Sequence, residues 1–339
     1  MIDLSYPAVT NVTRKLAVFA ALTLSCATGF GAGGGGGNTG GGTIYYVHTG
    51  LKTTWTMNSD GSNKTQLGFG TYGPVSTVKH NNHYWFLDTR EITPREYYPN
   101  GEYRTEVFAV RDDYDFNNNN NSATRVQLTN DITLQPAGDG LYALHWVPGG
   151  QMISIKARRW SGATVAEGGI YTASLQFGPD GNIIGLAAQP GAPAISFPLD
   201  GNQWPNVSTY CWDPTGSKVA YEERTGLLVA DLIGSPHQRI YNGIPHTPQW
   251  SSDGNKIAFT NATLSIMTIN PNGSGLREVI RRTNSWTFDR PFFSPTGSHI
   301  VCYGMGASGL DVFRVASNGN SLTNLTNTPS TNEYPMGWR

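Results

Sequence analysis

The stretch Trp250–Phe259 reads WSSDGNKIAF, and it decides the fold of this 339-residue chain. Trp250 ends one strand, Asp253 and Gly254 supply a tight turn, and Ile257 opens a second strand. Aspartate favours the start of such a turn, and glycine accepts the positive φ that a tight hairpin requires. The apolar alternation after the turn is typical of a strand with one buried face. The stretch therefore predicts a β-hairpin.

The same pattern occurs three more times without gaps. It reads WVPGGQMISI at Trp146–Ile155, WDPTGSKVAY at Trp212–Tyr221 and FSPTGSHIVC at Phe293–Cys302. Two of the hairpins are followed by another alternating strand and an Asn-Gly turn, at Leu264–Gly273 and Leu310–Gly319. An Asn-Gly turn between alternating segments indicates a further hairpin. Each repeat is therefore expected to hold four strands.

The spacing of the repeats indicates their architecture. The aromatic anchors Trp212, Trp250, Phe293 and Trp338 follow one another at intervals of 38, 43 and 45 residues. Units of about 40 to 45 residues with four strands each are typical of propeller blades. The sequence therefore predicts an all-β propeller.

The two ends of the chain are expected to complete one blade together. Thr43–Val47 has the pattern of a second strand with no first strand before it, and Glu333–Trp338 has the pattern of a first strand with nothing after it. Sharing a blade would close the ring and remove free sheet edges. With this shared blade the propeller has six blades. The other five are expected to start near Val75, Tyr142, Tyr210, Thr247 and Pro291.

Two blades carry long insertions. The second contains Glu91–Tyr103, which is rich in Tyr, Pro and charge, and the five-asparagine run Asn117–Asn121. The third contains Arg158–Gly168, which is expected to be a long loop. Insertions on a rigid scaffold are common sites of function, although loops also drift without acquiring one.

Residues 1–27 have the pattern of a signal peptide. Arg14 and Lys15 precede the apolar stretch Leu16–Leu24, which is too short to span a bilayer. The processing site has two readings, lipidation of Cys26 in a lipobox-like context or ordinary cleavage at a small-residue site. In either case the protein is expected to be exported.

A glycine-rich linker follows the signal peptide. Ten of the fourteen residues Gly29–Gly42 are glycine, and residues 28–42 are expected to form a flexible tether. The folded propeller is then expected to span residues 43–339.

The hairpin repeat resembles that of the TolB-like β-propellers. Ser251–Phe259 is the nearest copy in this chain, and Phe293–Val301 is similar. The resemblance implies a six-bladed ring with a central tunnel, often periplasmic and often used as a platform for partner binding. It covers mainly Tyr210–Arg339 and Thr43–Leu67 and does not extend to the second blade.

Composition and motifs argue against several classes of function. The formal net charge is −1, which does not fit a nucleic-acid-binding protein. The chain lacks a Gly-x-Ser-x-Gly elbow, an HExxH motif and a CxxC motif, so no cofactor and no metal are predicted. His80 and His83 stand close together in a predicted turn, without an evident third ligand. Glu222 and Glu223 are adjacent on a predicted strand and would point to opposite faces.

Polar residues recur at one position of three consecutive first strands. His246, Asp289 and Glu333 each stand two places before a proline, and Arg290 and Tyr334 stand beside the last two. First strands line the tunnel of a propeller, so these side chains are expected to converge near one mouth. Such a group could hold a cation, a sugar or a peptide end. The alternative is that they only line a water-filled tunnel.

The sequence therefore predicts a non-catalytic binding protein of the cell envelope, which uses the tunnel mouth and loops as its platform. The partner is expected to be another envelope protein or a small ligand, with membrane contact only through a lipid anchor. The protein would be a monomer located in the periplasm, anchored at the outer membrane or secreted. The alternative function is a propeller hydrolase or lyase acting on a polysaccharide or peptide, with Asp289, Glu333 and His246 as acid and base groups.

Overall fold

The fold comes from a computed structural model of the chain. It describes residues 41–48, 53–69, 78–92, 94–111, 124–137, 143–202, 207–232, 237–328 and 331–339. The predicted signal peptide with Cys26, most of the linker and the five-asparagine run lie outside these ranges. No helix in the described residues is long and apolar enough to cross a membrane.

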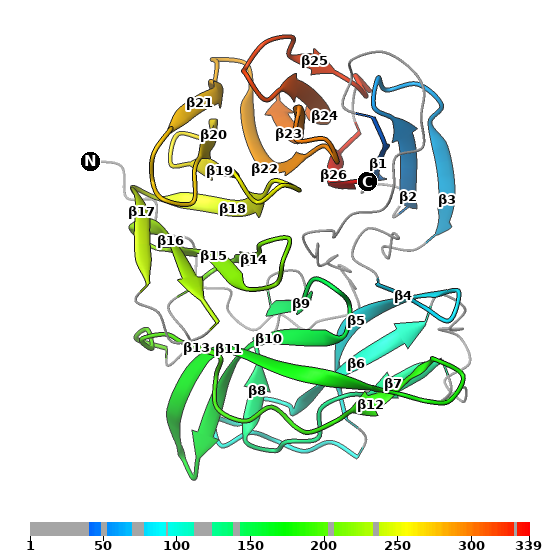
Figure 1. Ribbon diagram of the computed structural model, residues 1–339, viewed down its shortest axis with the longest axis vertical. Helices are drawn as coiled ribbons and strands as arrows, with labels where there is room; N and C mark the ends of the chain where they lie inside the picture. The colour runs from blue at the N-terminus through cyan, green and yellow to red at the C-terminus, as the bar shows by residue number, and fades with distance from the viewer. Residues whose placement is uncertain are drawn as a thin grey trace.

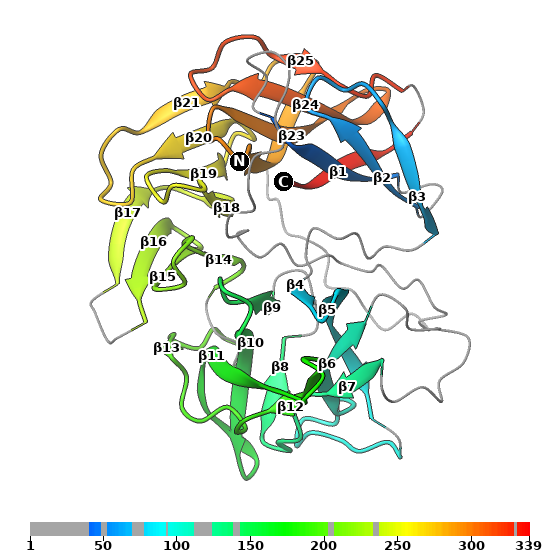
Figure 2. The same cartoon turned by 45° about the vertical axis from the view of Figure 1, so that its right-hand side comes forward.

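The strands form six sheets arranged as the blades of a ring, as Figures 1 and 2 show from two directions. The predicted all-β, six-bladed propeller is therefore confirmed. The first blade has the order β26 (Glu333–Trp338), β1 (Thr43–His48), β2 (Thr53–Asn58) and β3 (Thr65–Phe69). The second has β4 (Val78–His80), β5 (His83–Glu91), β6 (Thr105–Arg111) and β7 (Arg125–Gln127).

Three further blades are regular four-stranded sheets in chain order. The fourth blade has β14 (Tyr210–Trp212), β15 (Lys218–Glu223), β16 (Gly226–Asp231) and β17 (Gln238–Asn242). The fifth has β18 (Pro245–Trp250), β19 (Ile257–Asn261), β20 (Ile266–Ile269) and β21 (Arg277–Ile280). The sixth has β22 (Thr287–Phe293), β23 (His299–Gly306), β24 (Gly309–Ala316) and β25 (Thr323–Asn324).

The third blade is irregular. Its strands are β8 (Leu134–Pro136), β9 (Leu144–Trp146), β10 (Met152–Ser161), β11 (Thr164–Phe177), β12 (Ile183–Leu186) and β13 (Ile195–Ser196). Both β8 and β9 pair with β10. The expected loop Arg158–Gly168 is wrong, because this segment continues β10 and β11 as one long hairpin that turns at Gly162, where φ is 60°. Cross-strand pairing satisfies backbone groups that a loop would leave to water.

The repeated glycine has the role that the sequence predicts. Gly150, Gly216, Gly254 and Gly297 stand at equivalent turns with φ values of 68°, 71°, 71° and 69°. A residue with a Cβ is strained in this region, so the turn selects glycine. The four hairpin turns therefore share one backbone geometry.

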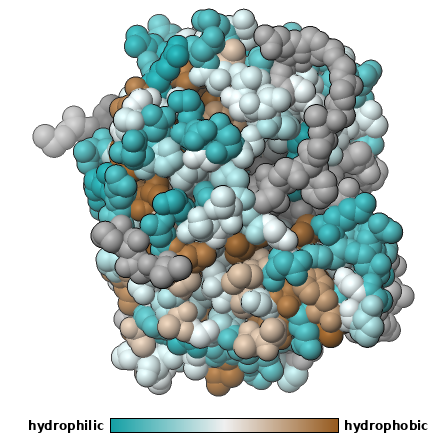
Figure 3. Space-filling model, viewed as in Figure 1, coloured by the Kyte–Doolittle hydropathy of each residue, from teal (hydrophilic) through white to brown (hydrophobic). Residues whose placement is uncertain are grey.

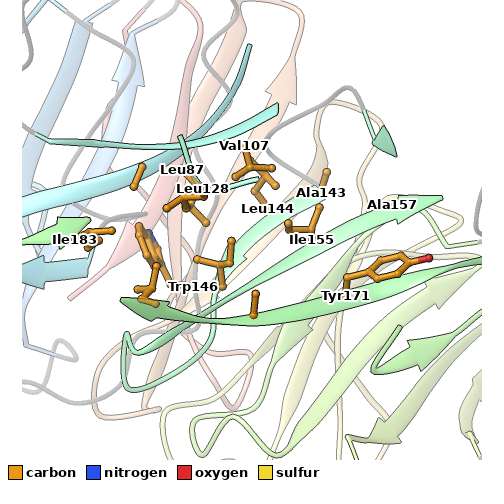
Figure 4. Packing of buried hydrophobic residues seen from close by; sticks show 14 of the residues in the cluster. Leu87, Val107, Leu128, Ala143, Leu144, Trp146, Ile155, Ala157, Tyr171 and Ile183 are labelled. Atoms are coloured by element: carbon orange, nitrogen blue, oxygen red, sulfur yellow. The ribbon is translucent and has the colours of Figure 1, made fainter. Parts of the chain in front are cut away.

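The aromatic anchors join neighbouring blades. The indole of Trp212 donates a hydrogen bond to Ser154 Oγ of the preceding blade at 2.9 Å. The indole of Trp250 donates to the carbonyl oxygen of Cys211, also one blade earlier, at 3.1 Å. Figure 4 shows Trp146 of the third blade within the apolar cluster that it forms with residues of the second. Trp212 and Trp250 therefore bury apolar area and satisfy their only polar side-chain atom between two sheets.

The shared blade closes the ring as expected. β26 pairs antiparallel with β1, so that Trp338 lies opposite Ile44 and Tyr334 opposite Val47. The Arg339 amide donates to the Thr43 carbonyl at 2.9 Å, and the Trp338 indole donates to the Gly41 carbonyl at 2.7 Å. The red strand β26 and the blue strand β1 consequently lie side by side in Figure 1.

We predict that Trp338→Ala destabilises the ring by about 3–5 kcal/mol, the usual loss when a buried tryptophan is truncated. The side chain is buried against the first and sixth blades, and its substitution also leaves the Gly41 carbonyl without the indole donor. Urea denaturation measures the change. The exposed Leu322→Ala should shift stability by less than about 0.5 kcal/mol. Equal effects of the two substitutions would contradict the role of the shared blade.

We also predict that His80 makes stability depend on pH. Burial lowers the pKa of its imidazole, and the hydrogen bond between Nε2 and the Gly150 carbonyl at 2.9 Å opposes this shift only in part. As the pH falls through about 6.5, the unfolded chain binds a proton that the folded state disfavours, so stability is lost. In melts from pH 8 to pH 5.5, His80→Gln should lose less stability than the parent. An unchanged pH dependence would contradict the prediction.

Candidate functional site

Two of the predicted site residues stand next to bulges in the inner strands. The pairing of β18 with β19 passes from His246↔Thr260 directly to Gln249↔Ala258. The pairing of β22 with β23 passes from Asp289↔Tyr303 directly to Phe292↔Val301. A proline in each interval cannot donate to the ladder, which favours a break at this point. The polar residue before each proline therefore marks an irregularity in the strand.

The residue between the polar position and the proline has an unusual backbone. Thr247 has a φ of 49° and Arg290 a φ of 55°. This region is unfavourable for residues with a Cβ, and a β-branched threonine is especially rare there. Such strain persists only where surrounding contacts hold it. The fifth and sixth blades thus each carry a strained bulge at the equivalent position of the inner strand.

Asp289 provides many of these contacts. Its Oδ1 accepts hydrogen bonds from the hydroxyls of Thr247 and Thr260 at 3.0 and 2.7 Å, and from the Arg290 amide at 2.7 Å. Its Oδ2 accepts from the Tyr303 hydroxyl at 2.9 Å. A carboxylate has about four acceptor sites. The four hydrogen bonds that Asp289 accepts therefore occupy most of its acceptor sites and connect the bulge of the fifth blade with that of the sixth.

Glu222 holds the first bulge from the fourth blade. The Thr247 amide donates to a carboxylate oxygen of Glu222 at 2.9 Å. Only 5% of Glu222 is exposed. Burial raises the pKa of this carboxyl, and nearby His246 opposes the rise. Its neighbour Glu223 turns the other way and pairs with Arg239 at 3.0 Å, as the alternation of a strand predicts. The sequence interpretation considered Glu222 only beside Glu223, because no local spacing links it to Thr247.

Arg290 and Tyr334 meet between the sixth and first blades. The Arg290 guanidinium carbon lies 5.3 Å from the centre of the Tyr334 ring, within cation–π range. Burial raises the pKa of the Tyr334 hydroxyl, and Arg290 lowers it to a smaller extent. Both side chains are half-buried. The structure therefore brings this predicted pair together.

Glu333 lies deeper than its partners. Only 4% of the residue is exposed, and a carboxylate oxygen accepts the Thr328 hydroxyl at 2.5 Å. Its charge also contributes to raising the pKa of Tyr46, after the larger effect of burial. Glu333 therefore faces the interior contacts of the first blade, whereas His246, Asp289, Arg290 and Tyr334 remain half-buried.

The described residues contain no group of three or more His, Cys, Asp or Glu side chains that could hold a metal ion. His246, Asp289 and Glu333 are thus not gathered as ligands of one ion. His80 and His83 lie opposite each other across their turn, but His80 Nε2 is bonded to Gly150 and its ring packs on Phe177 with centroids 4.7 Å apart.

Comparison with known proteins supports the fold. No family model matches the chain, and neither does any curated protein. TolB from Acinetobacter baumannii is similar with a TM-score of 0.51 and 13% identity, over 89% of this chain and 67% of that chain. A protein described as a TolB from Agrobacterium tumefaciens gives 0.47 and 12%, over 87% and 98%. An oligogalacturonate lyase in complex with manganese gives 0.46 and 12%, over 85% and 74%. The fold is that of the TolB-like six-bladed β-propellers.

We predict that Asp289→Ala destabilises the protein by about 2–4 kcal/mol, because it leaves the buried Thr260 hydroxyl and the strained bulges without their acceptor. Asp289→Asn should cost less, since its amide oxygen still accepts and its NH₂ can donate to the Tyr303 hydroxyl. Urea denaturation of both variants measures the difference. A stable alanine variant would show that Asp289 does not hold the bulges.

Proposed function

We propose that this propeller is a non-catalytic binding protein of the cell envelope, with its platform at the mouth formed by the fifth, sixth and first blades. The observation that carries this proposal is the engagement of the carboxylates. Asp289 accepts four hydrogen bonds from its surroundings, and Glu333 is buried against Thr328. Acid–base catalysis requires groups that can reach a substrate proton.

The half-buried side chains at this mouth suit binding better than bond cleavage. His246, Arg290 and Tyr334 offer an imidazole, a guanidinium and a phenol. These groups can orient a ligand through hydrogen bonds and ring contacts. His246 and Arg290 stand at the bulges of β18 and β22, and a position on a rigid strand reduces the entropy lost on binding.

A catalytic role would have to use a different carboxyl. Glu222 is the candidate, because burial raises its pKa beside the imidazole of His246. A carboxyl with a raised pKa can act as a general acid near neutral pH. Its low exposure and its bond to the Thr247 amide support a structural role instead.

The envelope location rests on the sequence. Residues 1–27 have the pattern of a signal peptide, and lipidation at Cys26 would add an anchor followed by the flexible linker of residues 28–42. A tethered monomeric platform would meet its partner, an envelope protein or a small ligand, without a need for tight membrane contact of its own.

The test is ligand binding without turnover. The full chain is titrated with short peptides bearing free or amidated carboxyl termini and with oligogalacturonides, and each mixture is then checked for products. We expect a ligand that is recovered unchanged and that binds at least about tenfold more weakly to an Arg290→Ala, Tyr334→Ala double variant, since each lost contact is worth about 1 kcal/mol.

The matched control is Arg281→Ala. Arg281 lies on the outer part of the fifth blade with 83% of its side chain exposed. The substitution removes one arginine that lies away from the proposed mouth, so the affinity for the ligand should stay within about twofold. Consumption of the ligand, lost in Glu222→Gln or His246→Ala, would replace the proposal with an enzyme. Binding that the double variant leaves unchanged would place the platform elsewhere.

A further inference from the structure

The insertion between β5 and β6 is an ordered hairpin. Tyr97 and Tyr103 form a bridge, and the chain reverses at Gly101, where φ is 80°. The Gly101 amide donates to the Tyr98 carbonyl, and the Tyr98 amide to the Glu102 carbonyl, both at 2.9 Å. In Figures 1 and 2 this cyan connection runs along the lower edge of the ring.

One face of the hairpin is fixed to the third blade. The buried Tyr98 hydroxyl donates toward the carbonyls of Thr105 and Leu134, at 2.9 and 3.1 Å. Glu102 accepts from the Gln135 amide at 2.6 Å. Arg104 is buried and pairs with both Glu96 and Glu106. These contacts hold the hairpin rigid, although nothing in them requires its other face to carry aromatic rings.

That other face carries two exposed tyrosines. Neighbouring residues of a strand alternate between faces, so Tyr97 and Tyr103 share the side opposite Tyr98. Tyr97 is 61% exposed and Tyr103 is 40% exposed. Their ring centroids lie 5.1 Å apart, and the Arg95 guanidinium carbon lies 4.6 Å from the centre of the Tyr103 ring. Arg95, Tyr103 and Tyr97 therefore form a stack, of which Tyr97 is the most exposed ring.

The polar groups beside the stack are balanced in charge and only partly engaged. Glu91 lies near Arg95 at 3.5 Å, and the two side chains are 47% and 62% exposed, respectively. This ion pair uses one carboxylate oxygen of Glu91. Glu96 and Glu102 lie on the opposite face, which carries Tyr98 and is fixed to the third blade. Glu91 can accept further hydrogen bonds, while the paired cation removes any strong preference for a charged ligand.

We propose that this hairpin is a binding site for a neutral oligosaccharide, with a pyranose ring placed on the exposed Tyr97 ring. A pyranose has an apolar face of C–H groups that can cover an aromatic ring and a rim of hydroxyls that donate to carboxylates. The rigid stack matches the first feature, and the half-exposed Glu91 carboxylate beside Arg95 matches the second. The site is separate from the tunnel mouth.

A different ligand is less well matched by these groups. A strongly basic or acidic partner would require a net field, and the ion pairs cancel most of it. Figure 3 shows hydrophobic residues gathered in separate patches over the lower half of the visible face, with hydrophilic residues between them. The Tyr97 ring, with Tyr103 and the Arg95–Glu91 pair beside it, combines an apolar face with hydrogen-bonding groups, as a pyranose does.

The experiment is calorimetric titration of the full chain with cellohexaose, chitohexaose, mannohexaose and maltohexaose. At least one should bind, and Tyr97→Ala should weaken that binding about tenfold, the effect of losing one stacked ring. Tyr97→Phe should stay within about twofold, because the ring face remains. Each variant is checked by thermal melting, which should change little because Tyr97 is exposed.

The control is Met305→Ala, which removes another exposed apolar side chain, here on β23, and should leave affinity unchanged. A proline-rich peptide and a trigalacturonate serve as comparison ligands. Failure of all four hexasaccharides to bind, binding that is equal in Tyr97→Ala, or Tyr97-dependent binding of a comparison ligand alone would overturn the proposal. The Arg290→Ala, Tyr334→Ala variant should bind the sugar normally, so failure at one site is distinguishable from failure at the other.

Discussion

The pairing of β26 with β1 is the interaction on which the other contacts of the ring depend. It supplies the inner strand of the first blade and brings Trp338 against Ile44. Phe292 and Val301 of the sixth blade then pack on Ile44 and Met57 of the first. Without β26, apolar faces of both blades would meet water, and β1 would become an open edge. Contact between residues almost 300 positions apart thus completes the first blade and joins it to the sixth.

Within this ring, carboxylates at and near the inner strands stabilise strained backbone before they are available for any other role. The bulges place Thr247 and Arg290 at positive φ, a conformation that costs free energy. Glu222 and Asp289 offset that cost by accepting hydrogen bonds from the strained residues. A polar residue on an inner strand is therefore not automatically available to a ligand. Availability depends on how many of its acceptor positions the fold already occupies.

The sequence predicts features governed by local chemistry. Turn glycines, alternating strands and the unpaired strands at the two ends follow from rules that act over a few residues, and the structure confirms them. Contacts between blades are harder to predict from the sequence, because they join residues with no local spacing in common. Glu222 meets Thr247 across two sheets, and Glu333 shares its position relative to proline with Asp289 but is buried. The prediction of a loop at Arg158–Gly168 was wrong. The segment has no turn signature as strong as Asn-Gly, so the sequence did not reveal that its two halves pair as strands.

The irregular second and third blades gain rigidity from the insertions that disturb their sequence pattern. Tyr98 and Arg104 anchor one hairpin, and Arg159 ties the other to Asp131 at 2.6 Å and to the Pro190 carbonyl at 2.8 Å. A flexible loop would lose conformational entropy on binding, whereas a hairpin already held by buried polar contacts loses little. The exposed rings on such a hairpin are consequently preorganised. Rigid exposure of this kind reduces the cost of recognition, so modest contacts with one sugar ring can produce measurable affinity.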